Sequence, residues 1–384
     1  MQPTVEPVRS HLTATQVQYL IEGAPGIKVG AGLDITDLAQ DDVTNVSGLY
    51  DGIFGGGEVE RSAYTTLHGA CRLSLAAPLE WGWAVAKPFM TITDGLITAR
   101  FNLGAYFTNT PKRSRKEQPP TFDVVGYDLL YALNTSVGDS YSVAKGTPIL
   151  ARVEEILLAR GFTKYIIDQS RADATAPDDK VWLLSENITW LQVVNDLLGM
   201  VGYAGVWSDW NGRMRCQPYQ RPVERPYEWY LPADQWTSIL GDDSDIQFDY
   251  HEAYNRWVGV RSNNIEDAAP IEGDGIYTLT NDTDGITSID ARRGLVLTRR
   301  EDFEVSSQAD LVTRVQAMAD ADMSIPTRID ARTGPLPLAW HFDRYLINDP
   351  GIGVPSEVVG SSWNLPLNGD PMSHAWTVLS GVRS

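Results

Sequence analysis

The stretch from Thr121 to Pro218 constrains the fold more than any other, because its local signals agree with one another. It opens with an alternating segment, Phe122 to Tyr127, that predicts a strand. After a polar loop, Thr147 is placed to cap a helix, Pro148 to begin it and Gly161 to end it. Five apolar residues at 3.6-residue spacing form one face of this helix: Ile149, Leu150, Val153, Ile156 and Leu157.

A second helix and a hairpin complete this stretch. Thr189 and Gln192 form the pattern of a capping box ahead of a broad apolar stripe. Two predicted strands, Tyr203 to Asp209 and Arg213 to Gln217, flank Asn211-Gly212, a dipeptide that suits both positive-φ positions of a tight turn. The sequence therefore predicts a small α/β unit in the middle of the chain.

The regions on either side are rich in short strands and glycine. Before the α/β unit, strands are predicted at Thr15–Ile21, Ala70–Leu75, Phe89–Thr93 and Ala99–Thr108. After it, they are predicted at Tyr227–Tyr230, Ile246–Tyr250, Arg256–Arg261, Asp274–Thr280, Gly294–Thr298, Trp340–Ile347, Ser356–Leu365 and His374–Leu379. One helix, capped by Ser307 with Asp310, interrupts this second group. Closely spaced short strands are typical of a barrel or a sandwich.

An ordered set of segments gives the chain a family resemblance. In the middle region the set comprises GYDLL, ARGF, TWLQVVNDLL and SDWNG. HGACRLSLAAPLEWG and ARFNLGAYF precede it, and SWNLPL follows near the end. Over most of its length the chain resembles the baseplate or tail hub proteins of tailed phages, in the version found as minor tail proteins of siphophages that infect actinobacteria. The specificity lies in the order of the segments, since no single one is diagnostic.

The resemblance implies a fold that is mainly β with an α+β insert. Two β-barrel, tail-tube-like domains would flank a small α/β domain, and a trimer would then present six barrels to the six-fold tail tube. On this basis we expect an N-terminal arm at 1–12, a first β-barrel hub domain at 13–134, an α/β domain at 135–220, and a second β-barrel hub domain with one inserted helix at 221–384.

The resemblance also implies a structural function. The chain would be a homotrimeric tail-tip subunit of a virion, assembled in the host cytoplasm, that joins the tail tube to the distal tip and lets DNA pass through its lumen. Its partners would be distal tail and tail-tube proteins, the tape measure protein and other tail-tip proteins. Two alternatives are a tail-associated cell-wall hydrolase and a receptor-binding tail protein that recognises glycans.

Charge and cysteine content limit the remaining functions. The chain carries 31 basic and 50 acidic residues, a net charge of −19, whereas nucleic-acid binders gain affinity from Lys and Arg on phosphate. Specific binding of DNA or RNA is therefore rejected, although an acidic wall suits a tube that conducts DNA.

Cys71 and Cys216 are expected to be free, buried thiols. The sequence contains neither a signal-peptide pattern nor an 18-residue apolar run, so we expect no membrane span.

Side chains that could carry chemistry are scattered along the chain. The histidines occur singly and without metal-binding spacing: His11, His68, His251, His341 and His374. Gly55-Gly56-Gly57 lacks the following Lys-Ser/Thr of a phosphate cradle and is predicted to be a flexible loop. Asn281–Gly285 lacks the final Glu of a calcium loop and is predicted to be a turn. Carboxylate pairs such as Asp242-Asp243 are expected by chance in so acidic a chain. No catalytic, cofactor-binding or metal-binding residue is assigned.

Tryptophan is the one residue type with two interpretations. Eight of the 12 stand in or beside predicted strands and turns: Trp81, Trp83, Trp207, Trp210, Trp257, Trp340, Trp363 and Trp376. They could line sugar-binding faces or serve as core and interface anchors. The second interpretation is favoured, because an indole ring contributes a large apolar area and carries a single donor.

Overall fold

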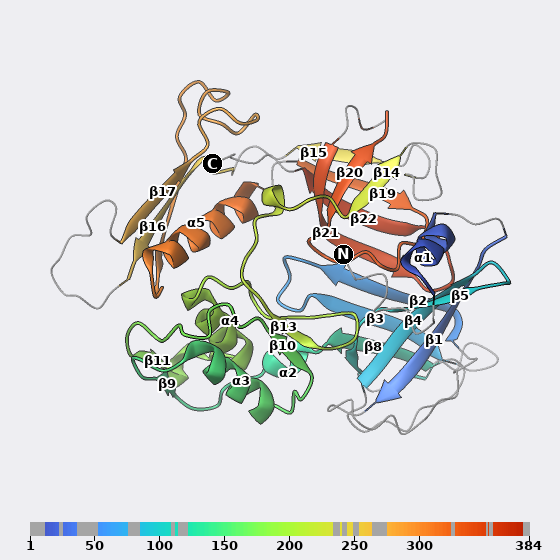
Figure 1. The fold of residues 1–384 in the computed structure, drawn as a ribbon, viewed down its shortest axis with the longest axis horizontal. Helices are drawn as coiled ribbons and strands as arrows, with labels where there is room; N and C mark the ends of the chain where they lie inside the picture. The colour runs from blue at the N-terminus through green and yellow to red at the C-terminus, as the bar shows by residue number, and fades with distance from the viewer. Residues whose placement is uncertain are drawn as a thin grey trace.

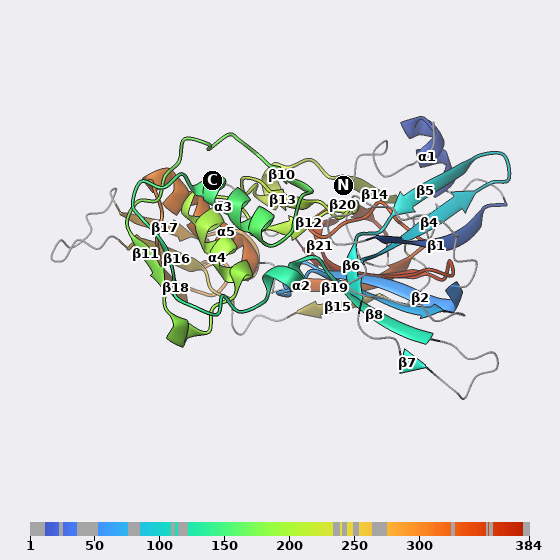
Figure 2. The same ribbon diagram turned by 90° about the horizontal axis from the view of Figure 1, so that it is seen from below.

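The computed structural model describes residues 12–22, 26–36, 53–75, 85–108, 112–113, 122–232, 239, 244–248, 253–262, 275–323, 327–350, 352 and 356–378. The predicted arm, apart from Leu12, lies outside these residues, and so do His11, His251, Asp242-Asp243, Trp81 and Trp83. Figures 1 and 2 show a large β-sheet on one side of the molecule and smaller sheets with helices on the other.

The large sheet contains 14 of the described strands. From the first half of the chain come β1 (Lys28–Thr36), β2 (Ile53–Ser62), β3 (Gly69–Leu75), β4 (Val85–Thr93), β5 (Thr98–Asn102), β6 (Tyr106–Thr108), β7 (Lys112–Arg113) and β8 (Phe122–Asp128). From the second half come β14 (Trp229–Pro232), β15 (Asp245–Phe248), β19 (Thr327–Thr333), β20 (Arg344–Asn348), β21 (Ser356–Pro366) and β22 (Met372–Val378). The main path runs β1-β4-β6-β8-β3-β2-β21-β22-β19-β15.

The pairing of β2 with β21 joins the two halves of the chain in this sheet. The two strands run antiparallel, from Glu58 opposite Pro366 to Ser62 opposite Ser362. The predicted pair of closed barrels is not found among the described strands, which pair into one large sheet whose main path runs from β1 to β15 and joins the two halves of the chain at β2 and β21. The strands β2 and β21 lie side by side in the middle of Figure 1.

The first predicted strand, Thr15–Ile21, is wrong, since this segment forms the helix α1 (Ala14–Ile21). Thr13 and Gln16 make a reciprocal capping box, with Gln16 N donating to Thr13 Oγ1 at 3.3 Å and Thr13 N to Gln16 Oε1 at 2.8 Å. Val17, Leu20 and Ile21 are buried at helical spacing, whereas Tyr19 is 49% exposed. The 3.6-residue period thus prevails over the two-residue alternation.

The middle of the chain forms the predicted α/β unit, defined here as residues 130–216. Its helices are α2 (Leu130–Leu133), α3 (Ile149–Ala159) and α4 (Trp190–Met200), with a 3₁₀ turn at Leu184–Glu186. Its strands are β9 (Tyr141–Val143) paired with β11 (Lys180–Trp182), and β10 (Tyr165–Ile167), β13 (Met214–Cys216) and β12 (Trp207–Ser208) in that order. All five residues predicted for the inner face of α3 are buried.

The turn and cap chemistry of this unit is confirmed in part. Thr189 caps α4 and accepts from Gln192 N, as predicted, whereas α3 is capped by Pro148 instead of Thr147. The hairpin of β12 and β13 is present, but only Gly212 of Asn211-Gly212 has positive φ, at 78°. One left-handed residue is enough here, because the side chain of Asp209 fixes the loop by accepting from the backbone N–H groups of Asn211 and Arg213.

A third unit combines β16 (Arg256–Arg261), β17 (Ile276–Thr280) and β18 (Thr298–Phe303) with α5 (Gln308–Met323). A second 3₁₀ turn at Pro222–Glu224 lies on the connection from the α/β unit to the large sheet. The helix cap at Ser307 is confirmed, since its hydroxyl accepts from Asp310 N at 3.2 Å. Trp257 of β16 is fully buried against α5 and donates its indole N–H to Asp322 at 2.8 Å.

Several strand predictions fail for identifiable reasons. Gly55-Gly56-Gly57, predicted to be a loop, lies in β2, where the register shifts between Ile53 and Gly57 and the ladder bonds of β3 hold the strand. The strand predicted at Gly294–Thr298 is wrong, because Gly294 has φ of +90° and β18 begins only at Thr298. The predicted strand at Ala99–Thr108 is broken into β5 and β6 by Gly104, whose φ is +110°. The sequence does not predict the strands β1, β7, β9, β10, β11 and β19.

The contact between β16 and α5 gives a first prediction. A methyl group on Gly259 would lie 2.2 Å from Val315 Cγ2, closer than any real contact. Gly259→Ala is therefore expected to lower the free energy of unfolding in urea by about 2 kcal/mol through overpacking. In the double variant with Val315→Ala the loss should be smaller than the sum of the two single losses. Strict additivity would contradict this packing.

Candidate functional site

Several segments that are distant in the sequence meet at one buried arginine. Arg61, on β2, is 1% exposed, and its Nη1 lies 3.9 Å from Asp128 Oδ2 at the end of β8. Nη1 also donates to the backbone oxygen of Ser208 in the α/β unit at 3.3 Å. The guanidinium lies over the ring of Trp340, 3.9 Å from its centroid. One side chain on β2 thus contacts three other segments of the chain.

Two glycines leave room for this guanidinium. A Cβ on Gly104 would lie 2.9 Å from Arg61 Nη2, and one on Gly69 would lie 3.2 Å from its Cζ. Gly104 also has φ of +110°, which side chains rarely adopt, and its N–H donates to Trp210 O at 3.0 Å. The glycines therefore let the backbone approach the arginine closely from two sides.

The carboxyl partner of Arg61 is also buried. Burial raises the pKa of Asp128 to about 6, against the opposing effects of Arg61 and of backbone N–H groups that include that of Leu130. Leu130 N donates to Asp128 Oδ1 at 3.1 Å. Beside the pair, the Tyr106 hydroxyl donates to Leu103 O at 2.7 Å, and burial raises the pKa of Tyr106. The ion pair of Arg61 and Asp128 is therefore fully buried among neutral groups.

Two histidines meet at the edge of this cluster, although the sequence suggested only isolated ones. The rings of His68 and His341 lie with centroids 5.1 Å apart, and Trp207 packs edge-on against His341 at 5.6 Å. Burial, with Arg61 nearby, lowers the pKa of His68 to about 4. Burial and these two neighbours, His68 and Arg61, also lower the pKa of His341. Both rings are therefore neutral at pH 7.

The other candidate residues of the sequence have structural surroundings. His374 stacks on Trp376 with centroids 4.7 Å apart and bonds to Thr333 Oγ1 at 2.9 Å. Cys71 and Cys216 are free and buried, as predicted, and burial raises the pKa of each thiol to about 12. Asn281 closes a turn by accepting from Asp284 N at 3.0 Å. Five of the tryptophans considered above lie in the core: Trp210, Trp257, Trp340, Trp363 and Trp376.

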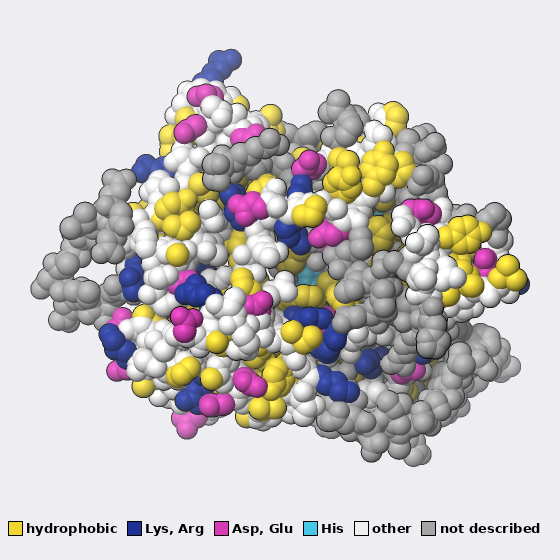
Figure 3. Space-filling model, viewed as in Figure 1, with side chains coloured by type: hydrophobic (Ala, Val, Ile, Leu, Met, Phe, Trp, Pro, Cys, Tyr) yellow, Lys and Arg dark blue, Asp and Glu magenta, His cyan; other side chains and the backbone are white. Residues whose placement is uncertain are grey.

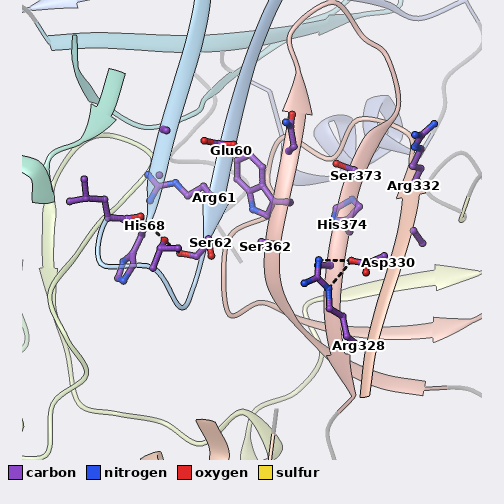
Figure 4. A pocket seen from close by; sticks show the side chains of 18 of the residues that line it. Glu60, Arg61, Ser62, His68, Arg328, Asp330, Arg332, Ser362, Ser373 and His374 are labelled. Carbon is purple, nitrogen blue, oxygen red and sulfur yellow. Dashed lines mark hydrogen bonds and ion pairs between the residues drawn. The ribbon is translucent and has the colours of Figure 1, made fainter. Parts of the chain in front are cut away.

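Two cavities flank the cluster. One, of about 690 Å³, lies over the face of the large sheet and is lined from β2, β21, β22 and β19. Figure 4 shows its polar lining, including the ion pair of Arg328 with Asp330 at 2.9 Å. The other, of about 610 Å³, lies between the α/β unit, α5 and the segment that precedes β20. We call this second cavity the aromatic cleft; its most prominent lining residues are Tyr64, Trp207, Trp210, Trp340, His341 and Phe342.

Within the described ranges, no group of three or more His, Cys, Asp or Glu side chains is placed to hold a metal ion. No helix among these same residues is long and apolar enough to cross a membrane.

Comparison with solved structures identifies the fold. The tail protein from Neisseria meningitidis MC58 matches 92% of this chain and 97% of its own, with a TM-score of 0.63 and 11% identity. The 43 kDa tail protein of prophage MuSo2 from Shewanella oneidensis matches 92% and 98%, with a TM-score of 0.60 and 13% identity. The prophage tail protein gp18 from Listeria monocytogenes EGD-e matches 92% and 95%, with a TM-score of 0.50 and 11% identity.

The chain therefore has the fold of phage tail proteins. No protein-family model matches the sequence, and no curated protein matches it either. The three structures give no support to the actinobacterial host that the sequence resemblance implied. At 11 to 13% identity the likeness lies in the arrangement of the elements and transfers no residue role.

The buried ion pair gives a second prediction. Arg61→Met leaves Asp128 buried without its cation, so the free energy of unfolding in urea should fall by about 3 kcal/mol. The matched control is Arg72→Met on the neighbouring strand, where the side chain is 65% exposed. That control should change stability by less than about 0.5 kcal/mol. Equal losses in the two variants would contradict a special role for Arg61.

His68 gives a third prediction, which concerns the pH dependence of stability. His68 has a pKa of about 4 when folded and its ordinary value, 6.5, when unfolded. The unfolded chain therefore takes up the proton first, and stability is lost as pH falls from 6.5 toward 4. Asp128, with its raised pKa, acts in the opposite direction between its ordinary value of 3.8 and about 6.

A variant separates the two contributions. His68→Gln removes only the imidazole, so its stability loss between pH 7 and pH 4.5 should be smaller than that of the wild type by roughly 2 kcal/mol. Urea unfolding at the two pH values measures this difference. Parallel pH profiles for the wild type and the variant would show that His68 titrates normally when folded.

Proposed function

We propose that this chain is a structural subunit of the tail tip or baseplate hub of a tailed phage. The observation that carries the proposal is the extent of the shared fold, since 92% of the chain aligns with 97 to 98% of two tail proteins. A likeness that spans both chains almost entirely supports a common architectural role better than one shared module would. The proposal assigns no catalytic residue and no cofactor.

The physical properties of the chain are consistent with assembly into a ring. Hub subunits would associate as a homotrimer around an axis, where each surface patch recurs by symmetry. Exposed apolar side chains support such contacts, and one group follows the chain through β11 and the next turn: Val181, Leu183 and Leu184, exposed by 52%, 50% and 60%. The net charge of −19 suits a lumen that repels the phosphates of passing DNA.

In this role the protein would connect the tail tube to the distal tip. Distal tail or tail-tube proteins and the tape measure protein would bind on one side of the ring, and other tail-tip proteins on the other. The large sheet would form the rigid wall, because its strands from both halves of the chain are joined at β2 and β21. The domain boundaries at 134 and 220 remain predictions.

The mass of the purified protein tests this function. Light scattering should give about three times the 42.4 kDa of one chain, and negative-stain images of the same fraction should show a ring with a central opening. A stable monomer that also fails to join rings when tail-tube protein is added would contradict the hub function.

A further inference from the structure

The aromatic cleft has features that the structural role does not use. Figure 3 shows a hollow in the middle of this face, with a histidine at its floor and hydrophobic and basic side chains around it. Its lining comes mainly from four distant parts of the chain: the turn after β2, the segment from Gly202 to Arg225 that includes β12 and β13, the helix α5 and the segment before β20. A cavity of about 610 Å³ has the size of a ligand pocket.

The mouth of the cleft is formed by a strained aromatic residue. Phe342 has φ of +66°, which a bulky side chain rarely adopts, yet its ring is 38% exposed. The backbone is held there because Phe342 N donates to Gly360 O at 2.9 Å and Arg225 donates to Phe342 O. The ring packs edge-on against Tyr64, itself 52% exposed, with centroids 6.0 Å apart. The turn before β20 holds this strained backbone, and such strain is frequent at binding sites.

The lining also holds donors that lack acceptors. Trp210 and Trp340 are 5% and 3% exposed, and their indole N–H groups have no hydrogen-bond partner in the described part of the chain. The same holds for Arg225 Nε. These nitrogens are themselves shielded from solvent, so they do not define what the cleft binds.

One basic side chain of the cleft lining differs from the others. Arg215 is paired with Asp209 at 2.8 Å and Arg225 with Glu228 at 3.4 Å. Arg314 forms no ion pair with a described residue, and its guanidinium lies 5.2 Å from the ring centroid of Phe303. Burial lowers the pKa of Arg314, against the opposing effects of Glu301 and Asp196. A partially buried cation of this kind favours a carboxylate ligand.

We propose that the aromatic cleft binds a peptide segment of a partner protein in which an aromatic or aliphatic side chain stands beside Asp or Glu. The apolar side chain would pack against Phe342 and Tyr64, and the carboxylate would be bound by the basic lining at Arg314. A saccharide fits less well, because the exposed rings of Tyr64 and Phe342 meet at 89°, edge to face, instead of forming a flat platform, and a neutral sugar brings no charge to Arg314. This site is independent of the hub function.

Two small probes test the binding of a carboxylate beside an aromatic ring. Acetyl-Phe-Asp-amide and its uncharged match, acetyl-Phe-Asn-amide, are titrated into the purified protein and followed by saturation-transfer NMR. The Asp probe should bind at least about fivefold more tightly than the Asn probe, because a charge-assisted hydrogen bond is stronger than a neutral one. Chitotriose serves as the saccharide probe and should neither bind nor compete.

Matched variants locate the site. Arg314→Gln should weaken the Asp probe about fivefold and leave the Asn probe unchanged, whereas Arg300→Gln, at an exposed position on β18, should change neither. Phe342→Gly removes the ring and relieves the left-handed backbone, so it should weaken both probes without lowering the thermal midpoint. Tyr19→Ala on α1 is its control, since that exposed ring lies outside the cleft lining.

Three results would overturn the proposal. They are a folded wild type that binds neither peptide, equal affinity for the Asp and Asn probes, and binding that survives both Arg314→Gln and Phe342→Gly. Chitotriose that binds in place of the peptides would assign the cleft to a glycan instead. Circular dichroism on each variant separates loss of the site from loss of the fold.

Discussion

The arrangement of this molecule depends on one buried guanidinium. Arg61 forms an ion pair with Asp128 at 3.9 Å, donates to Ser208 O and lies over Trp340, so it links β2 with the end of β8, the α/β unit and the segment before β20. A buried charge is costly unless it is paired, which makes each contact conditional on the others being in place. The pairing of β2 with β21 sets Arg61 opposite Trp363, whose ring contacts Trp340, and the glycines at 69 and 104 leave room for the guanidinium. Pairing across the sheet and burial of the charge therefore support each other.

The sequence predicts well what local chemistry decides. The helices α3, α4 and α5 and the hairpin after Trp207 were expected from caps, apolar spacing and a turn dipeptide, all of which act within a few residues. The failures have non-local causes. Thr15–Ile21 alternates like a strand, yet buries a helical face. The glycine-rich start of β2 resembles a loop, but the strand β3 and the N–H of Leu367, which donates to Gly57 O, hold it in the sheet. The closed barrels implied by the resemblance are not found among the described strands, because strands from both halves of the chain pair into one large sheet.

The site was less predictable than the fold. No pattern in the segment GEVERS distinguishes Arg61 from an exposed arginine, because its burial depends on Asp128 and Trp340, 67 and 279 positions further along. His68 and His341 seemed isolated for the same reason and meet only through the fold. The strain at Phe342 is invisible in sequence, since nothing but the observed φ reveals it. What could be inferred was the absence of familiar catalytic patterns, together with the ordered segments that led to the tail proteins.

The fold, the acidic composition and the joined sheet support one account, in which this chain is a rigid tail-hub subunit that presents a cleft to a partner. The most direct test of its central claim is immunogold electron microscopy on particles produced from the genome that encodes the chain, with antibodies raised against the purified protein. The account predicts gold at the distal end of the tail and nowhere else on the particle. Gold on the head, or particles without label whose proteins include no trace of this chain by mass spectrometry, would contradict it.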